Sequence, residues 1–205
     1  DEKPRDIDLA VFLPHGPLRV YVMGKRGVNR EEASQEDLES MKQIAREGLA
    51  AGAVGISSSR TLLHLSSTGD NVPTYEAATS EMKELGSCLS GEQGQVLQFI
   101  SDFAEAEQEF DILRETSLQT GAKGTFTLIA TDNPLGEVTE SSEVWRQHLA
   151  RIEEAQSKGL DIRGQVISRP IGILMGHPAT MSPFYRRPTF MACQQLPHEE
   201  RMAKL

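Results

Sequence analysis

The chain has 205 residues, enough for one domain of good size and short for two. Its hydrophobic content of 38% is ordinary for a globular protein, and its net charge of −9 argues against a nucleic-acid partner, because phosphate binding needs a basic stripe. The longest apolar stretches, such as residues 171–175, are far too short to span a bilayer, so no membrane partner is expected. Cys88 and Cys193 are isolated thiols, which suit a reducing compartment and a cytoplasmic location.

Strand-like and helix-like segments alternate along the chain. β-Branched and aromatic runs predict strands at residues 18–23, 53–57, 95–101, 124–130 and 160–168. Apolar residues at helical spacing predict helices at residues 36–52, 76–89, 103–121 and 145–159. The first of these helices has Ser34 before it and Gly52 at its end, which are start and stop signals.

This alternation predicts βαβ units and therefore a parallel α/β sheet. An open doubly wound sheet and a (β/α) barrel both fit the spacing. The phosphate-binding patterns GxGxxG and GxxxxGK[ST] are absent from the sequence, so nothing supports a nucleotide-binding open sheet. Residues 172–190, rich in glycine and proline, are expected to form a long functional loop or lid.

Ligands of parallel α/β folds bind beyond the carboxyl ends of the strands, and polar residues follow several predicted strands. The stretch GISSS at residues 55–59 lacks the closing glycine of the GxSxG nucleophile motif. A Ser-His-Asp triad there would have to use His64, and serines that bond the loop backbone are the simpler interpretation. Among the other histidines, His15 and His177 are the two with potential for a site.

Two charged pairs are candidates for chemistry at the strand ends. Asp102 and Asp132 are able to act as a carboxylate pair in acid–base catalysis, although aspartates there also cap helices. Arg60 and Arg169 suit the binding of a substrate carboxylate, and a structural ion pair is an equally good interpretation. No pair of histidines stands at metal-ligand spacing, so the sequence assigns no metal ligand in this chain.

Four stretches carry a resemblance to a known family: FLPHGPLRVYVMG, EDLESMKQIAREGLAAGAVGISSSRTLLH, VPTYEAATSEMKELG and LDIRGQVISRPIGILMG. In consistent order through most of the chain, they resemble the N-acyl-D-amino-acid deacylase (D-aminoacylase) branch of the amidohydrolase superfamily. The resemblance implies a (β/α)8 barrel that hydrolyses the linear amide of N-acyl-D-amino acids with bound zinc. The partner of the protein would then be a small-molecule substrate, an N-acyl amino acid. Its oligomeric state stays open.

The resemblance also implies that residues 1–205 are the central part of the barrel domain. A complete barrel takes about 250 residues, so the chain is expected to be an incomplete internal segment of about five β/α units. Zinc ligands would then lie mostly outside it. Histidine ligands of the family's fifth and sixth strands are missing, because the strand ends here read QFISDF and TLIATDN.

The resemblance places His15 in the family's glycine-histidine segment, and it places Arg60 and His64 in a substrate-holding loop. Ser58 is expected to contact substrate or backbone, Arg60 or Arg169 to bind its carboxylate, and Asp102 or Asp132 to orient water. Two functions therefore stay open from the sequence. One is metal-assisted hydrolysis of N-acyl amino acids, and the other is metal-free binding of acylated amino acids or peptides without turnover.

Overall fold

The structure is a computed structural model that describes residues 6–67, 69–75, 77–103, 105–128, 144–169, 172, 174–176, 182–184 and 187–204. Two units are distinguished by their internal contacts. The first contains residues 1–64 and 71–166, and the second contains residues 65–70 and 167–205. Among the described residues, no helix combines the length and apolarity needed to cross a membrane.

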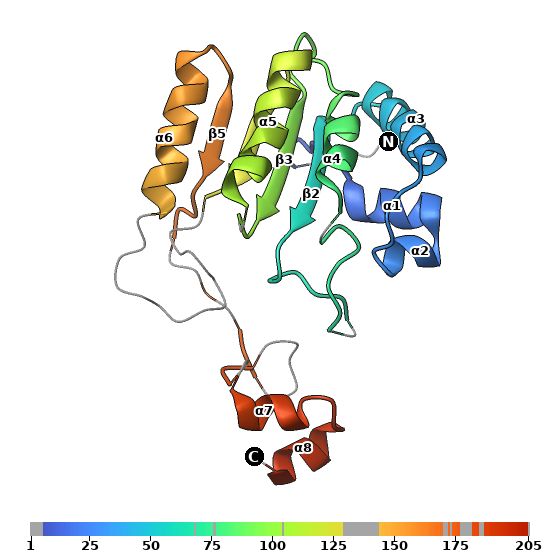
Figure 1. Cartoon of the computed structure of the whole chain (residues 1–205), viewed down its shortest axis with the longest axis vertical. Helices are drawn as coiled ribbons and strands as arrows, with labels where there is room; N and C mark the ends of the chain where they lie inside the picture. Colours follow the sequence, from blue (N-terminus) through green and yellow to red (C-terminus); the bar gives the residue numbers. More distant parts are fainter. Residues whose placement is uncertain are drawn as a thin grey trace. The chain divides into compact units, whose positions relative to one another are not determined.

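The first unit is built on a parallel sheet of five strands (Figure 1). The strands are β1 (Phe12–Pro14), β2 (Gly55–Arg60), β3 (Val96–Ser101), β4 (Lys123–Thr127) and β5 (Ile162–Gln165). Their order in the sheet follows their order in the chain, and every neighbouring pair is parallel. After each strand the chain crosses back to the opposite end of the sheet before the next strand begins. All carboxyl ends of the strands therefore lie at one edge.

The main helices of this unit are α3 (Gln35–Ala50), α4 (Thr79–Gly86), α5 (Ala106–Thr120) and α6 (Val144–Ser157). They pack against one face of the sheet. On that face, every strand after β1 contributes fully buried apolar residues to the core: Ile56, Leu97, Phe99, Phe126 and Ile162. The helices complete the core with residues that include Met41, Met82, Phe110 and Ile152.

Residues that alternate with these core positions point to the other face of the sheet, because successive side chains of a strand point in opposite directions. They include Ser57, Gln98 and Thr127, which are partly buried. A doubly wound sheet has helices on both faces and a reversal of strand order. A sequential parallel sheet with its helices on one face is instead a segment of a (β/α) barrel. The structure thus resolves the alternative that the sequence left open.

The predicted first strand is wrong. Residues 18–23 lie in helix α1 (His15–Met23), which a short helix α2 (Lys25–Val28) follows, and the first strand is β1, just before α1. The run LRVYVM has strand propensity, but helix formation buries Leu18, Arg19 and Met23 on one face while Tyr21 stays exposed. Pro17 in the first turn and Gly24 after the last residue are helix signals that local β-propensity obscured.

The other predicted strands and helices are confirmed, with shifted ends. Ser34 caps α3 in a capping box with Asp37, and Gly121 ends α5 with a left-handed φ of 69°. In the second unit, the last residues of the predicted loop start helix α7 (Pro188–Cys193), and α8 (His198–Lys204) follows. Most of residues 171–186 lie outside the described part of the chain.

Candidate functional site

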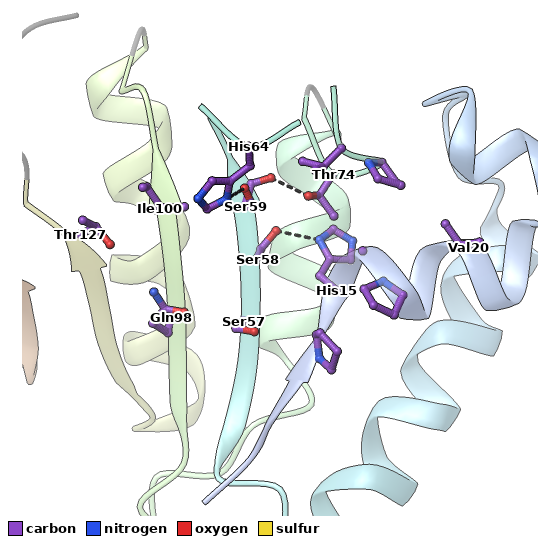
Figure 2. A pocket seen from close by; sticks show the side chains of 15 residues that line it. His15, Val20, Ser57, Ser58, Ser59, His64, Thr74, Gln98, Ile100 and Thr127 are labelled. Carbon is purple, nitrogen blue, oxygen red and sulfur yellow. Dashed lines mark hydrogen bonds between the residues drawn. The ribbon is translucent and has the colours of Figure 1, made fainter. Parts of the chain in front are cut away.

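A pocket of about 730 Å³ lies in the first unit, toward the carboxyl ends of β1 to β4 (Figure 2). This is the edge of a parallel α/β sheet at which ligands bind. The strands, the first turns of α1 and the segment after β2 all contribute to its wall. The lining residues are Pro14, His15, Gly16, Pro17, Val20, Ser57, Ser58, Ser59, His64, Val72, Pro73, Thr74, Gln98, Ile100 and Thr127.

The pocket lining combines apolar side chains with neutral polar ones. Proline, valine and isoleucine side chains supply the apolar part, and serine, threonine, glutamine and histidine side chains supply the polar part. None of the described lining residues is an aspartate, glutamate, lysine or arginine. The pocket therefore suits a neutral polar group with an apolar substituent better than it suits a densely charged ligand.

His15, the first residue of α1, joins the pocket to a buried ionic cluster. Its Nδ1 lies 2.9 Å from the Oγ of Ser58, and Figure 2 shows the two side chains facing each other. Its Nε2 lies 2.6 Å from Oε1 of Glu81 on α4. His15 is fully buried and Ser58 is 9% exposed, so this hydrogen-bonded line lies between the pocket and the helix layer.

The same oxygen of Glu81 accepts a hydrogen bond of 2.7 Å from Nε of Arg19. Arg19 is 1% exposed, and its other nitrogens donate to the carbonyl oxygens of Gly27, Pro73 and Glu31 at 3.3, 3.1 and 2.5 Å. Burial raises the pKa of Glu81, but hydrogen bonds and electrostatic interactions with His15 and Arg19 outweigh burial and lower that pKa. Glu81 is therefore ionised, and through Pro73 the cluster also fixes one wall of the pocket.

A second serine–histidine pair lies at the mouth of the pocket. The Oγ of Ser59 is 2.7 Å from Nδ1 of His64, and His64 is exposed. The Oγ1 of Thr74 donates to the carbonyl oxygen of Ser59 at 2.5 Å, which ties residues 72–74 to β2 (Figure 2). No carboxylate contact to His64 is found among the described residues, so this pair lacks the third group that a triad requires.

Arg60 does not line the pocket. Its guanidinium forms an ion pair with Glu109 on α5, at 2.7 Å, and it donates to the carbonyl oxygen of Ala77. Both side chains are 10% exposed. Of the two interpretations that the sequence left open for Arg60, this geometry favours the structural ion pair.

Asp102 is engaged by the loop that follows β2. Its Oδ1 accepts a hydrogen bond from Oγ1 of Thr61 at 2.5 Å, and its Oδ2 accepts one from the backbone N–H of Leu62 at 2.8 Å. It lies outside the pocket lining, and it holds the segment that carries His64. Asp102 thus holds the loop after β2. The alternative interpretation of the sequence was that it caps a helix.

Asp132 and His177 lie outside the described residues. Arg169 is exposed and belongs to the second unit, which is described by itself. His15, Ser58 and His64, by contrast, line one pocket although 43 residues separate His15 from Ser58.

The described residues do not fit a zinc centre. No group of three histidine, cysteine, aspartate or glutamate side chains is arranged to hold a metal ion within the described ranges. Both ring nitrogens of His15 and both carboxylate oxygens of Asp102 already have partners. The described part of the pocket therefore offers neutral hydrogen-bonding groups and a buried histidine.

The sequence reasoning missed Glu81, Arg19, Thr74 and Gln98. Glu81 reads as an ordinary surface residue of an amphipathic helix, and Arg19 fell in a predicted strand. Glu81 lies 66 residues from His15 and 62 from Arg19, so no local spacing connects them. For Gln98 a weak signal existed, because its position on the pocket face follows from the alternation along β3.

No family model matches the chain, and no curated protein matches it. Among solved structures, the chain is similar to a mutant D-aminoacylase in complex with CuCl2, with a TM-score of 0.61 and 21% sequence identity. The similar region covers 81% of this chain and 31% of that one, so the chain spans about a third of the length of that D-aminoacylase. The chain thus shares a parallel α/β fold with that D-aminoacylase.

Proposed function

We propose that the protein is an amidohydrolase-type hydrolase that binds N-acyl amino acids in this pocket and cleaves their linear amide bond. The observation that carries the proposal is the position and lining of the pocket. It lies at the carboxyl ends of the strands of a D-aminoacylase-like fold, and its wall combines apolar and neutral hydrogen-bonding side chains.

The lining suits an amide with an apolar acyl chain. Pro17, Val20 and Val72 offer an apolar wall for the chain. The side-chain amide of Gln98 offers both a donor and an acceptor to a substrate amide. A volume of about 730 Å³ lies in the range of about 300 to 1,000 Å³ that is usual for small-molecule sites.

The carboxylate of the amino acid needs a partner outside the described lining. Arg60 is engaged by Glu109, which leaves Arg169 as the other arginine that the sequence suggested for this role. A guanidinium binds a carboxylate through two parallel hydrogen bonds, which is the chemical reason for that suggestion.

The test uses the full-length protein with a panel of N-acyl amino acids of both configurations and several acyl lengths. Amine release is measured by mass spectrometry, and binding is measured by calorimetry. Gln98→Leu is expected to raise KM about tenfold, the effect of losing about 1.4 kcal/mol of binding. The matched control Gln119→Leu changes an exposed glutamine of α5 and should leave KM unchanged.

Hydrolysis of at least one member of the panel, weakened by Gln98→Leu, supports the proposal. Saturable binding without amine release would contradict hydrolysis and favour binding without turnover. Neither binding nor release across the panel would contradict the assigned substrate class.

A further inference from the structure

We propose that residues 72–74, the wall segment of the pocket, are held in a fixed position by Thr74 and Arg19, and that this position selects the acyl group of the substrate. The proposal rests on the proposed function for the identity of that group. It adds which residues determine the width of the space that receives the acyl group. The three residues of the wall segment, Val72, Pro73 and Thr74, all line the pocket.

Thr74 ties the wall segment to the sheet. Its Oγ1 donates a hydrogen bond of 2.5 Å to the carbonyl oxygen of Ser59 on β2, as Figure 2 shows, and Thr74 is 2% exposed. A Cβ atom placed on Gly16 would lie 3.8 Å from the methyl carbon of Thr74, so the two residues are close neighbours. Thr74 therefore holds one end of the wall segment against β2 and beside the first turn of α1.

Arg19 ties the wall segment to α1. Its Nη1 donates to the carbonyl oxygen of Pro73 at 3.1 Å, and its Nε is held by Glu81 at 2.7 Å. Arg19 is 1% exposed, so water does not compete for these bonds. Its neighbour in the sequence, Val20, lines the pocket as well. Arg19 therefore sets the spacing between Val20 on α1 and Pro73 in the wall segment, which are two parts of the apolar wall.

The backbone of the wall segment is also ordered by its own turns. The N–H of Tyr75 donates to the carbonyl oxygen of Val72 at 3.0 Å, which closes a turn with Pro73 at its second position, where proline is favoured. The N–H of Ala77 donates to the carbonyl oxygen of Thr74 at 3.2 Å. The wall segment is therefore preorganised before a ligand binds, and a preorganised wall discriminates between ligands by their shape.

A wall that cannot retreat limits the thickness of the acyl group. A linear chain is narrower than a ring, so the fixed wall segment favours the linear chain. Thr74→Val keeps the shape of threonine but removes its hydroxyl donor, so the wall segment can yield to a ring and loses contact with a linear chain. The preference for linear over cyclic groups should fall about tenfold, the lower end of what an apolar pocket achieves by shape.

The test uses two neutral amides, heptanamide and cyclohexanecarboxamide, which carry a linear and a cyclic group. Neither contains an amino acid, so the result does not depend on hydrolysis. Their dissociation constants for the full-length protein are measured by ligand-observed NMR. The wild type is expected to bind heptanamide more tightly, and Thr74→Val should reduce this preference. Thr74→Ser, which keeps the hydroxyl, and Thr189→Val, at an exposed threonine of α7, should retain it.

A second measurement needs no variant and covers the case in which Thr74→Val does not fold. Hydrogen exchange of the wild type is followed at the backbone amides of Tyr75 and Ala77, which close the turns of the wall segment. Both amides are expected to exchange about 100-fold more slowly than in an unstructured peptide, because the two ties keep these turns closed.

An unchanged preference in Thr74→Val, or an equal loss in Thr74→Ser, would overturn the role of the wall segment. Amide exchange in the wild type at the rate of an unstructured peptide would overturn it too, as would a wild type that binds neither amide. If N-acyl amino acids are hydrolysed with an acyl preference that Thr74→Val leaves unchanged, the proposed function stands and this inference fails. A reduced amide preference in Thr74→Val without hydrolysis of any N-acyl amino acid would support the wall segment and contradict the proposed function.

Discussion

Arg60 donates hydrogen bonds to both carboxylate oxygens of Glu109. Its Nε lies 3.0 Å from Oε1 and 2.8 Å from Oε2, and its Nη2 lies 2.7 Å from Oε1. This bidentate pair links the end of β2 to α5, on the helix side of the sheet. It explains why a strand-end arginine that suits a substrate carboxylate is already occupied.

The first prediction concerns this ion pair. Arg60→Met removes the partner of a nearly buried carboxylate and is expected to lower the free energy of unfolding by about 3 kcal/mol, the usual cost of breaking such a pair. Urea unfolding measures the loss. Replacing both residues, as Arg60→Met with Glu109→Leu, should recover part of it, because no unpaired charge then remains.

The same variant separates the two interpretations of Arg60. Well below its unfolding temperature, Arg60→Met should leave KM for N-acyl amino acids unchanged. A rise in KM under folded conditions would restore the role of carboxylate ligand that the sequence suggested.

The second prediction is a pH dependence that comes from Glu81. Its pKa is lower in the folded protein than the value of about 4.3 for an unfolded glutamate. The stabilisation is therefore complete above about pH 4.3, and it is lost as pH falls from there through the lower folded pKa. Urea unfolding between pH 7 and pH 2.5 is expected to show this loss in the wild type.

Glu81→Gln should remove this contribution to the slope of unfolding free energy against pH. It should also destabilise the protein at neutral pH, since Arg19 would keep a buried charge without its partner. The exposed control Glu153→Gln should keep the wild-type slope. An identical acid slope in Glu81→Gln and wild type would contradict the linkage.

The third prediction concerns the loop held by Asp102. Asp102→Ala removes the acceptor for Thr61 and for the N–H of Leu62, so this amide should exchange with deuterium faster. Hydrogen exchange read by mass spectrometry tests it on peptides that cover residues 60–64. The exposed control Asp70→Ala lies outside these contacts. Unchanged protection of Leu62 would show that the loop does not depend on Asp102.

The fourth prediction concerns His148, which is buried beside Phe103 and Phe126 at ring-centroid distances of 4.5 and 5.8 Å. Burial, together with the charge of Arg151, lowers the pKa of His148 in the folded protein. The unfolded chain therefore binds the proton first, and stability falls as pH drops below about 6.5, the value of an unfolded histidine.

His148→Phe should flatten this fall between about pH 6.5 and pH 5, where Glu81 contributes little. Thermal unfolding at half-unit pH intervals measures it. The exposed His198→Gln is the control and should follow the wild type. A His148→Phe variant with the wild-type pH profile would assign the effect to another group.

The sequence by itself determined the alternation of strands and helices, since both follow from local periodicity. Ser34 with Asp37 and the glycine at 121 mark helix ends because capping acts over three or four residues. The sequence also placed three pocket residues among the candidates: Ser58 because it follows a predicted strand, and His15 and His64 because of the family resemblance.

Only the tertiary structure decided which of these groups meet. In the structure, residues 18–23 belong to helix α1 and not to the predicted strand, because burial of Leu18 and Met23 outweighs local β-propensity. That helix brings His15 and Arg19 to Glu81, and the contact spans more than 60 residues. Likewise Arg60 and Glu109 form an ion pair although they are 49 residues apart in the sequence. Partners this distant are set by packing of the elements, for which local spacing carries no information.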